Sequence, residues 1–469
     1  MRDVKVCPMM PWVTGMPKQC VVVARIERMC DTHISDKEMR SSAQRKGDNA
    51  VATVTAQAAK TATVKVAKPT PTKVAARVLT PAQARAFLLR RAGGPLHAEQ
   101  ALPDVLALVH AIGYLQIDPV AVVAAMHHLI ARTRLPHYTP ADLDAALYRD
   151  RTLVETFPHI HAVVPIAHWR HYDQRTSPPY RIENDDPETV VRVLATITER
   201  GPLASRHFTT AEDREHIVYG WGNTPRVQAA LHALARRGAI LVHHREGTEK
   251  VYDLAERLVP PLVDVTPVTD AERALHVAAR ELTYGGLTGR SRLAPAISNG
   301  DAVPVEVEGV RGTWYVPAAE WDGAQVTPPV AAGEGGAHLL APLDPLVHDR
   351  KRLAALFGFD YTWEVYTPAV KRRYGPYTMP VLWGDRFVAR IDPSLDRKRG
   401  TLHLRAVWFE PDAPDTATLY TDIAAEITRF AAFHGATTIT LGPVMPDNRT
   451  GPLRAALESA LTILPVAPA

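Results

Sequence analysis

The sequence predicts an α+β fold in which three similar helix-and-hairpin units follow one another, with a β-rich C-terminal domain after them and a basic arm before them. One helix and a two-stranded hairpin follow each other directly in residues 224–254, and the same order of elements recurs upstream and downstream. From Gly336 onward, short strands rich in proline, glycine and aromatic residues replace this pattern and favour a β-barrel-like domain. The expected arm, three units and C-terminal domain are residues 1–77, 78–186, 187–264, 265–335 and 336–469.

The arm is expected to be disordered. Residues 1–77 hold 14 Lys and Arg against 6 Asp and Glu, and the stretch from Asn49 to Lys73 has neither helical nor strand periodicity. Cys7, Cys20 and Cys30 all lie here, and their spacing matches no tetrahedral zinc pattern. The sequence therefore predicts no metal site and no cofactor. It also shows no signal peptide and no long apolar run, so we expect a cytoplasmic protein with no membrane partner.

The first unit contains two Thr-Pro pairs that predict helix starts. Thr80 with Pro81 and Thr139 with Pro140 fit, because threonine accepts hydrogen bonds from backbone N–H groups and proline suits the first helical position. An apolar segment between these pairs predicts another helix. The expected helices are 81–91, 102–112 and 141–148, and the expected strands are 153–157 and 162–165.

The middle unit is the clearest of the three. Thr224 is the expected N-cap of a helix, and Gly238 is expected to end it. Strands 239–244 and 250–254 are joined by a turn at Gly247, which can adopt the positive φ that such turns need. One face of the helix is apolar at the spacing i, i+3, i+4, i+7, through Val227, Ala230, Leu231 and Leu234.

This middle unit has the form of a recognition helix with a wing. Arg226, Arg236 and Arg237 are expected on the solvent side of the helix, where they could meet DNA phosphates. The alternative is an ordinary αββ packing unit.

The third unit and the C-terminal domain complete the pattern. Asp270 is expected to cap a helix that runs through Leu282, and Thr288 to cap a shorter one. Residues 303–308 and 313–317 form a predicted hairpin. In the C-terminal domain the expected later elements are a helix at 421–433, a strand at 437–441 and a helix at 451–461.

Basic residues in the body are concentrated in one region. Beyond the arm the chain carries a net charge of −4, whereas residues 350–405 hold 12 basic and 5 acidic residues. A solvated charged face is the alternative for any one cluster, but interleaved aromatic residues favour a nucleic-acid surface. The clusters are Arg350-Lys351-Arg352, Lys371-Arg372-Arg373 and Arg397-Lys398-Arg399, and the aromatic residues are Tyr361, Trp363, Tyr366, Tyr374 and Tyr377.

Gln116 and Asp118 are the candidate catalytic pair. Two residues apart on an extended stretch, their side chains point to the same side. Such a pair can hold a water molecule, and the carboxylate can stabilise the oxocarbenium ion that forms when a glycosidic bond breaks. The alternative is a polar pair that ties a loop to a helix end.

A set of motifs carries a specific resemblance. Between about residues 78 and 410 the chain contains, in order, LQIDPV, AAMHHLIARTRLPHY, GPLASRHF, ARRGAILVHHREGTEKVYDLAERLVP, APLDPLVHDRKRLAALFGFDY and YTPAVKRRYGPYTMPVLWGDRFVARIDP. As a set they resemble the YcaQ-like (AlkZ-like) family of winged-helix DNA glycosylases that repair crosslinks. The resemblance implies three tandem winged helices and a C-terminal β-barrel around a DNA channel. It also implies excision of bulky N7-alkylated purines and unhooking of interstrand crosslinks.

The family's catalytic motif of Gln, an aliphatic residue and then Asp or Gln falls on Gln116, Ile117 and Asp118. The Asp version resembles the branch with the broader substrate range. One departure concerns residues 156–161, TFPHIH, which stand where relatives have Tyr-Trp-Ala-His-Glu. An aromatic and an acidic group expected near the pocket are therefore altered, and this departure concerns the lesion preference more than the reaction class. The candidate pocket residues are Tyr114, His159 and His161.

Together these observations predict a monofunctional DNA glycosylase, since no lysine occurs at the motif to form a Schiff base. Its expected partner is double-stranded DNA carrying alkylated bases or crosslinks, and we expect a monomer associated with the nucleoid. The alternative is a tandem winged-helix DNA-binding protein or transcriptional regulator without catalysis. A lesion sensor that binds alkylated DNA without turning it over is a third hypothesis.

Overall fold

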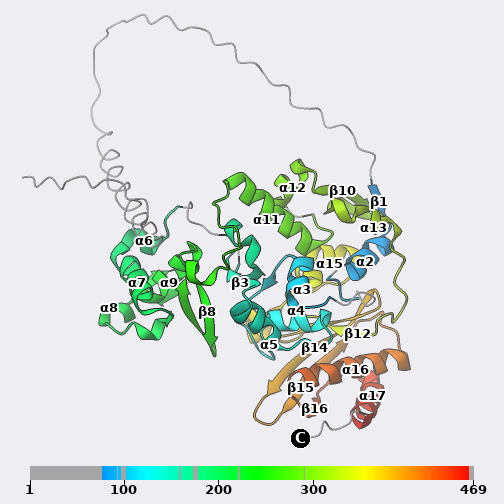
Figure 1. Ribbon diagram of the computed structural model, residues 1–469. Helices are drawn as coiled ribbons and strands as arrows, with labels where there is room; N and C mark the ends of the chain where they lie inside the picture. The colour runs from blue at the N-terminus through cyan, green and yellow to red at the C-terminus, as the bar shows by residue number, and fades with distance from the viewer. Residues whose placement is uncertain are drawn as a thin grey trace, which may run out of the picture. The chain divides into compact units, whose positions relative to one another are not determined.

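The computed structural model describes residues 77–91, 93–96, 102–157, 160–172, 178–219, 222–289 and 291–463. The chain divides into two compact units, and in the described residues one is made of 178–257 and the other of 77–172 with 258–463 (Figure 1). The predicted arm lies outside the described residues, apart from Arg77. No helix among these residues is both long and apolar enough to cross a lipid bilayer.

The smaller unit confirms the predicted helix and hairpin. The face of α9 formed by Val227, Ala230, Leu231 and Leu234 is buried, and strands β8 and β9 follow it directly. Strand β5 pairs with β9, which gives the order β5-β9-β8. The elements are α6 (Arg181–Asp185), α7 (Pro187–Arg200), β5 (Leu203–Ala204), α8 (Ala211–Arg214), β6 (His216–Tyr219), β7 (Gly222–Pro225), α9 (Arg226–Arg236), β8 (Ile240–Glu246), β9 (Glu249–Leu254) and α10 (Ala255–Leu258).

The start of α9 differs from the prediction. Thr224 does not cap the helix, because it is drawn into β7, which pairs with β6. The helix begins two residues later, at Arg226. Gly238 follows its end with a φ of 70°, as predicted for a terminating glycine.

The larger unit begins with a short strand and the helices of the first predicted unit. Strand β1 pairs in parallel with β10, and β2, β4 and β3 form an antiparallel sheet in that order. The elements are β1 (Arg77–Leu79), α2 (Pro81–Arg90), α3 (Val105–Ile112), β2 (Leu115–Gln116), α4 (Met126–Arg134), α5 (Pro140–Asp144), a π-helical turn η1 (Ala145–Arg149), β3 (Leu153–Thr156), β4 (Ala162–Pro165) and the 3-10 helix η2 (Ile166–His171).

The next segment contains the predicted hairpin but not the predicted short helix start. Thr288 forms a bridge with Tyr315 instead of capping a helix, and the 3-10 helix η4 (Ser291–Leu293) leads into α12 from Ser291 onward. The cap of α11 also differs, because Thr269 accepts the N–H of Glu272 and Asp270 is the first helical residue. The elements are α11 (Asp270–Gly285), α12 (Ala294–Asn299), β10 (Ala302–Val307), β11 (Val310–Pro317) and α13 (Trp321–Val326).

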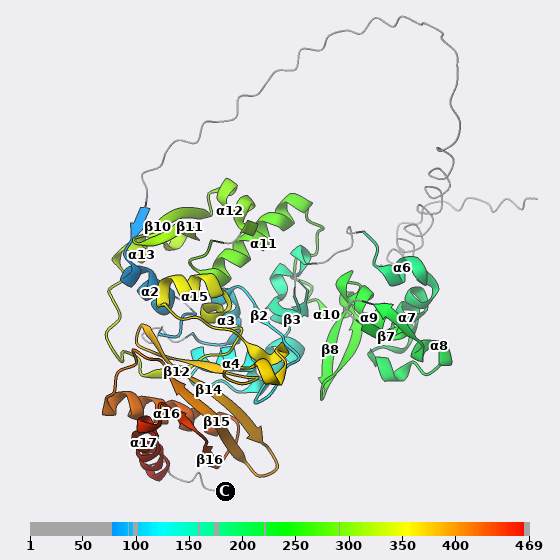
Figure 2. The same ribbon diagram turned by 180° about the vertical axis from the view of Figure 1, so that it is seen from behind.

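The C-terminal part is a curled, half-barrel sheet in the order β12-β13-β14-β15-β16, with β17 also on β15. Helices α16 and α17 pack together beside it, and on the other side of the unit α2 lies beside α15 (Figure 2). The elements are β12 (Ala337–Leu339), α14 (Pro345–His348), α15 (Arg350–Phe357), the 3-10 helices η6 (Glu364–Tyr366) and η7 (Ala369–Lys371), β13 (Met379–Trp383), β14 (Arg386–Asp396), β15 (Thr401–Phe409), α16 (Ala417–Phe433), β16 (Thr438–Leu441), β17 (Val444–Met445) and α17 (Thr450–Ile463).

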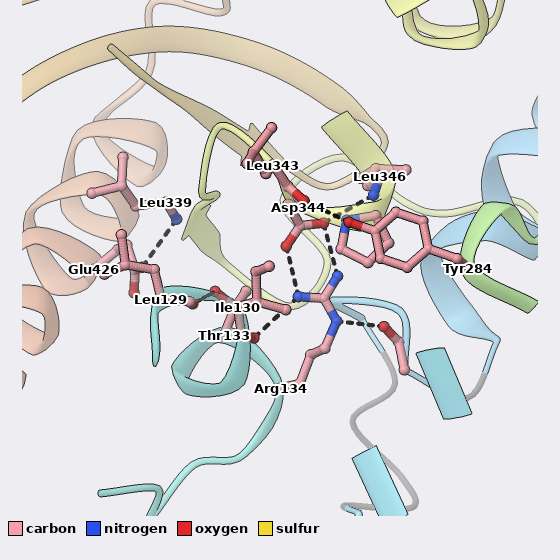
Figure 3. A network of polar contacts seen from close by, with 12 residues as sticks. Leu129, Ile130, Thr133, Arg134, Tyr284, Leu339, Leu343, Asp344, Leu346 and Glu426 are labelled. Atoms are coloured by element: carbon pink, nitrogen blue, oxygen red, sulfur yellow. Dashed lines mark hydrogen bonds and ion pairs between the residues drawn. The ribbon is translucent and has the colours of Figure 1, made fainter. Parts of the chain in front are cut away.

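One hydrophobic core joins the first segment to the C-terminal sheet. Side chains of α3, α4, β13 to β15 and α16 belong to the same buried cluster. A buried ion pair lies across this contact: Arg134, at the end of α4, donates to both carboxylate oxygens of Asp344 at 2.7 and 2.8 Å (Figure 3). Residues 105–157 and 160–163 are therefore packed as one body with residues 337–457.

Candidate active site

Gly113, at the end of α3, turns the chain toward the candidate catalytic pair Gln116 and Asp118. Its φ of 95° favours glycine, and a Cβ there would lie 2.9 Å from the carbonyl oxygen of Arg280 in α11. The chain can therefore turn tightly against α11 and enter β2, where Gln116 pairs with Ala162 of β4. The N–H of Ile117 extends this pairing by donating to the carbonyl of His161 at 2.8 Å.

Asp118 lies just beyond β2 and is partly buried. Its carboxylate accepts a hydrogen bond from the N–H of Val120 at 2.8 Å. Burial raises the pKa of Asp118, and the Val120 N–H only partly offsets this effect. A carboxylate that is costly to keep ionised interacts strongly with a cation placed beside it, and it also accepts protons more readily than an exposed aspartate.

Two elements of the C-terminal part border the segment that follows Asp118. The hydroxyl of Tyr377 is 3.5 Å from the carbonyl oxygen of Ala124, and burial followed by the negative charge of Asp118 raises the pKa of Tyr377. Arg397, in the turn between β14 and β15, donates to the carbonyl of Val123 at 2.6 Å. The sequence could not reveal these neighbours, because they lie more than 250 positions away.

Tyr114 does not line a pocket. Its ring is 2% exposed and stacks on Tyr284 with a centroid separation of 4.3 Å. The hydroxyl is 3.5 Å from a carboxylate oxygen of Glu281. The pocket prediction for Tyr114 is wrong, because the ring fills the contact between the end of α3 and α11.

The first basic cluster is mostly structural. Arg352 is 0% exposed and donates to the backbone carbonyls of Gly285, Leu287, Pro345 and Leu346. The prediction that it contacts DNA is wrong, because a guanidinium enclosed by carbonyls cannot reach a phosphate. Arg350 is also partly buried: it donates to Pro342 at 2.9 Å and lies over the Tyr361 ring. Only Lys351 of this cluster is exposed.

The other two clusters present cations to solvent. Lys371 and Arg373 are exposed, whereas Arg372 between them donates to the carbonyl of Thr367 at 2.8 Å and so helps to hold its own loop. Lys398 is exposed at the turn between β14 and β15. The backbone N–H of Lys398 donates to Asp396 at 3.1 Å, which fixes the shape of that turn.

The arginines of α9 are engaged inside the smaller unit. Arg226 donates to Asp186 and Glu215, both at 2.6 Å. Arg237 donates to both oxygens of the Glu183 carboxylate at 2.8 and 2.7 Å. The prediction that Arg237 faces phosphates is wrong, because its side chain is buried against Glu183. Arg226 is only partly buried, and its contact with DNA stays a prediction. Arg236 lies over the Tyr180 ring, and its contact with DNA stays a prediction.

Comparison with known proteins shows which family the chain belongs to. The model of the family described as DNA glycosylase AlkZ-like matches residues 109–433, which is well over half of the sequence. The chain belongs to the AlkZ-like DNA glycosylase family. The Streptomyces sahachiroi DNA glycosylase AlkZ has a similar structure, with a TM-score of 0.52 and 15% identity over 78% of this chain and 100% of that one. At this identity the structural likeness supports the fold, and the family match supports the activity of a DNA-repair glycosylase.

In this AlkZ-like chain an acidic residue lies beside the altered segment 156–161. Glu155 of β3 is buried, accepts a hydrogen bond from Tyr148 at 2.5 Å and is 2.9 Å from Nε2 of His161. Sequence reasoning missed Glu155, although it directly precedes the altered segment. Strand register places Gln116 beside Ala162, so alternation puts the Glu155 and His161 side chains on the opposite face of this sheet. His159 lies outside the described residues.

A separate cavity of about 290 Å³ lies at the end of α15. None of the predicted site residues lines it. Its lining residues are Arg85, Leu356, Phe357, Gly358, Phe359, Asp385, Arg386, Phe387, Glu410 and Asp412. Within the described part of the chain, no three His, Cys, Asp or Glu side chains are grouped so that they could hold a metal ion.

Proposed function

We propose that this protein is a monofunctional DNA glycosylase that excises bulky N7-alkylated purines and unhooks interstrand crosslinks, with Asp118 and Gln116 as its catalytic residues. The observation that carries the proposal is the setting of Asp118. Its carboxylate is partly buried, and the segment after it is contacted by two elements that carry exposed cations, the loop before Tyr377 and the turn at Arg397. Negative DNA can therefore be held beside a group suited to stabilising a positive sugar.

The proposed reaction needs no strong general acid. Alkylation at N7 makes the purine cationic, so the base leaves with the electron pair of the glycosidic bond and becomes neutral. Asp118 stabilises the oxocarbenium ion that remains, and Gln116 positions a water molecule whose oxygen bonds to the sugar carbon. Asp118 accepts the proton that this water loses. The products are the free base and an abasic site in an uncut strand.

A crosslinked base is tied to the opposite strand, so it cannot be turned fully out of the duplex into a closed pocket. We propose that Asp118 reaches such a base from an open surface. Exposed Lys371, Arg373 and Lys398 would then hold the flanking phosphates, and Lys351 would add a further contact.

A single incubation tests the activity. A duplex with one 7-methylguanine is mixed with the protein, and abasic sites are scored as strand breaks after mild alkali. We expect breaks only after alkali, and parallel release from a nitrogen-mustard crosslink. An absence of release above the uncatalysed rate would favour the non-catalytic DNA-binding alternative, and breaks without alkali would contradict a monofunctional reaction.

The rate is expected to fall in acid at a higher pH than for an ordinary aspartate. The reaction requires the carboxylate form, and burial raises the pKa of Asp118, so activity is lost as the pH falls through this raised value. Single-turnover rates measured between about pH 4 and pH 8 should show an acid limb above the ordinary aspartate pKa of about 3.9. A rate independent of pH over this interval would contradict proton acceptance by Asp118.

Replacement of Lys371 and Arg373 by Gln should weaken binding to damaged and undamaged duplex alike. Phosphate contacts are independent of sequence, and each one lost flattens the slope of log affinity against log salt by about one unit. The matched control replaces Arg311 and Arg454, two exposed arginines elsewhere in the larger unit, and should leave the slope unchanged. Both measurements use fluorescence anisotropy at several salt concentrations. An unchanged slope in the first variant would exclude these residues from phosphate binding.

We also propose that the chain has three winged-helix units, acts as a monomer and is associated with the nucleoid in the cytoplasm. The order β5-β9-β8 behind α9 supports the middle unit. An experimental structure tests the number of units, sedimentation velocity tests the monomer, and imaging of a fluorescent fusion tests the localisation.

A further inference from the structure

The loop of residues 364–375 exposes two large apolar side chains. Tyr366 is 78% exposed and Val370 is 93% exposed, four positions apart. Exposed Lys371 and Arg373 follow Val370 on the same loop. An isolated exposed apolar residue is common, but an aromatic and an aliphatic residue beside cations on one loop suit a partner that is both stacked and negatively charged.

This loop is held rigidly from inside. The carboxylate of Glu364, which is buried, accepts hydrogen bonds from the backbone N–H groups of Arg373, Tyr374 and Gly375 at 2.8, 2.8 and 3.0 Å. Burial alone would raise the pKa of Glu364, but these donors hold it below its usual value. Arg372 closes the other side through the carbonyl of Thr367. An apolar tip on a loop that is already ordered loses little conformational entropy when it binds.

The loop is joined to the candidate active site by aromatic contacts. Trp363 meets Tyr366 edge to face at a centroid distance of 6.0 Å and meets Tyr377 at 6.1 Å. Tyr377 in turn contacts the segment that follows Asp118 through the carbonyl of Ala124. These contacts place the loop on the same body as the segment after Asp118, so a duplex long enough to span both can meet the loop.

We propose that the loop inserts Val370 between stacked base pairs beside the lesion, from the minor groove, with Tyr366 against the sugars and Lys371 and Arg373 on the flanking phosphates. The inference rests on the proposed function. N7 of a purine lies in the major groove, so a bulky adduct fills that groove and leaves the minor groove open. Apolar side chains that enter the minor groove unstack a base step and kink the duplex. Such unstacking exposes the glycosidic bond without requiring the base to leave its partner.

The test measures unstacking apart from catalysis. A duplex carries 2-aminopurine next to a single 7-methylguanine, and all proteins carry Asp118→Asn so that base release is slow compared with the fluorescence measurement. Val370→Ser is compared with Val326→Ser, which makes the same change at a residue that is 79% exposed in α13. At saturating protein we expect the parent and Val326→Ser to give the same rise in 2-aminopurine fluorescence, and Val370→Ser to give at most about a third of it. Both positions are exposed, so thermal melting should match the parent.

Equal fluorescence from Val370→Ser and the parent would overturn the inference, as would the absence of any rise in the parent. The second result would favour a protein partner for the exposed pair. With Asp118 intact, we expect Val370→Ser to slow single-turnover excision about tenfold. A loss of unstacking in Val370→Ser supports the wedge even if no protein excises the base, and that outcome would refute the proposed function alone. Normal excision with equal unstacking would refute the wedge alone.

Discussion

Asp118→Asn is expected to lower the single-turnover rate of 7-methylguanine excision by about 10²- to 10³-fold, the range found when one electrostatic stabiliser is removed from an active site. The amide has the same shape but carries no charge and accepts no proton from water. Its oxygen can still accept the Val120 N–H, so the segment after β2 should keep its conformation. Gln116→Ala should cost less, on the order of tenfold to a hundredfold, because it removes positioning but leaves the charge.

The control for this experiment is Asp360→Asn, which makes the same change at an exposed residue of the larger unit. It should leave excision unchanged. Affinity for the damaged duplex, measured separately, should be nearly the same in all three variants, because Asp118 acts on the transition state. Full activity in Asp118→Asn would remove this residue from the mechanism, and a matching loss of affinity would assign it to binding.

Asp344→Ala is expected to lower the free energy of unfolding by about 3–5 kcal/mol, the typical effect of removing one partner of a buried ion pair. The substitution leaves Arg134 buried between α4 and the C-terminal part without its bidentate carboxylate. It also removes the oxygen that accepts the N–H of Leu346 at 2.9 Å. Urea denaturation followed by fluorescence gives the free energy of unfolding.

The double variant Arg134→Met with Asp344→Leu distinguishes a buried charge from a general packing defect. Since it removes both charges and keeps apolar volume, it should recover much of the lost stability. Asp150→Ala is the matched control, because it breaks a surface pair with Arg149 and should leave unfolding close to the parent. An equal loss in the single and double variants would contradict the electrostatic explanation.

The sequence predicted elements whose signals are local. The buried face of α9 and the hairpin β8–β9 depend on periodicity and a turn glycine, and both lie within two residues of their expected positions. Local motifs also led to the family and to the choice of Gln116 and Asp118 as the candidate catalytic pair. Thr224 was misassigned because a strand partner, β6, competed with the helix for it.

Burial of the arginines could not be predicted in this way. In the sequence, Arg352 belongs to a run of three basic residues, and so does Lys371, so the two runs look alike. Its carbonyl partners at Gly285 and Leu287 lie 67 and 65 positions away, so only the folded chain reveals that it is enclosed. The contact of Tyr377 with the segment after Asp118 is hidden for the same reason.

The core that α3 and α4 share with the C-terminal sheet limits how this protein can be re-engineered. Asp118 lies on a segment that packs against α3 and α4 on one side and against residues of the C-terminal part on the other. A graft of residues 105–163 from a relative would bring the reactive groups but leave them against a foreign sheet and a foreign α16. To exchange lesion preference between relatives, the segment around Asp118 and the C-terminal sheet with α16 must therefore be transferred together.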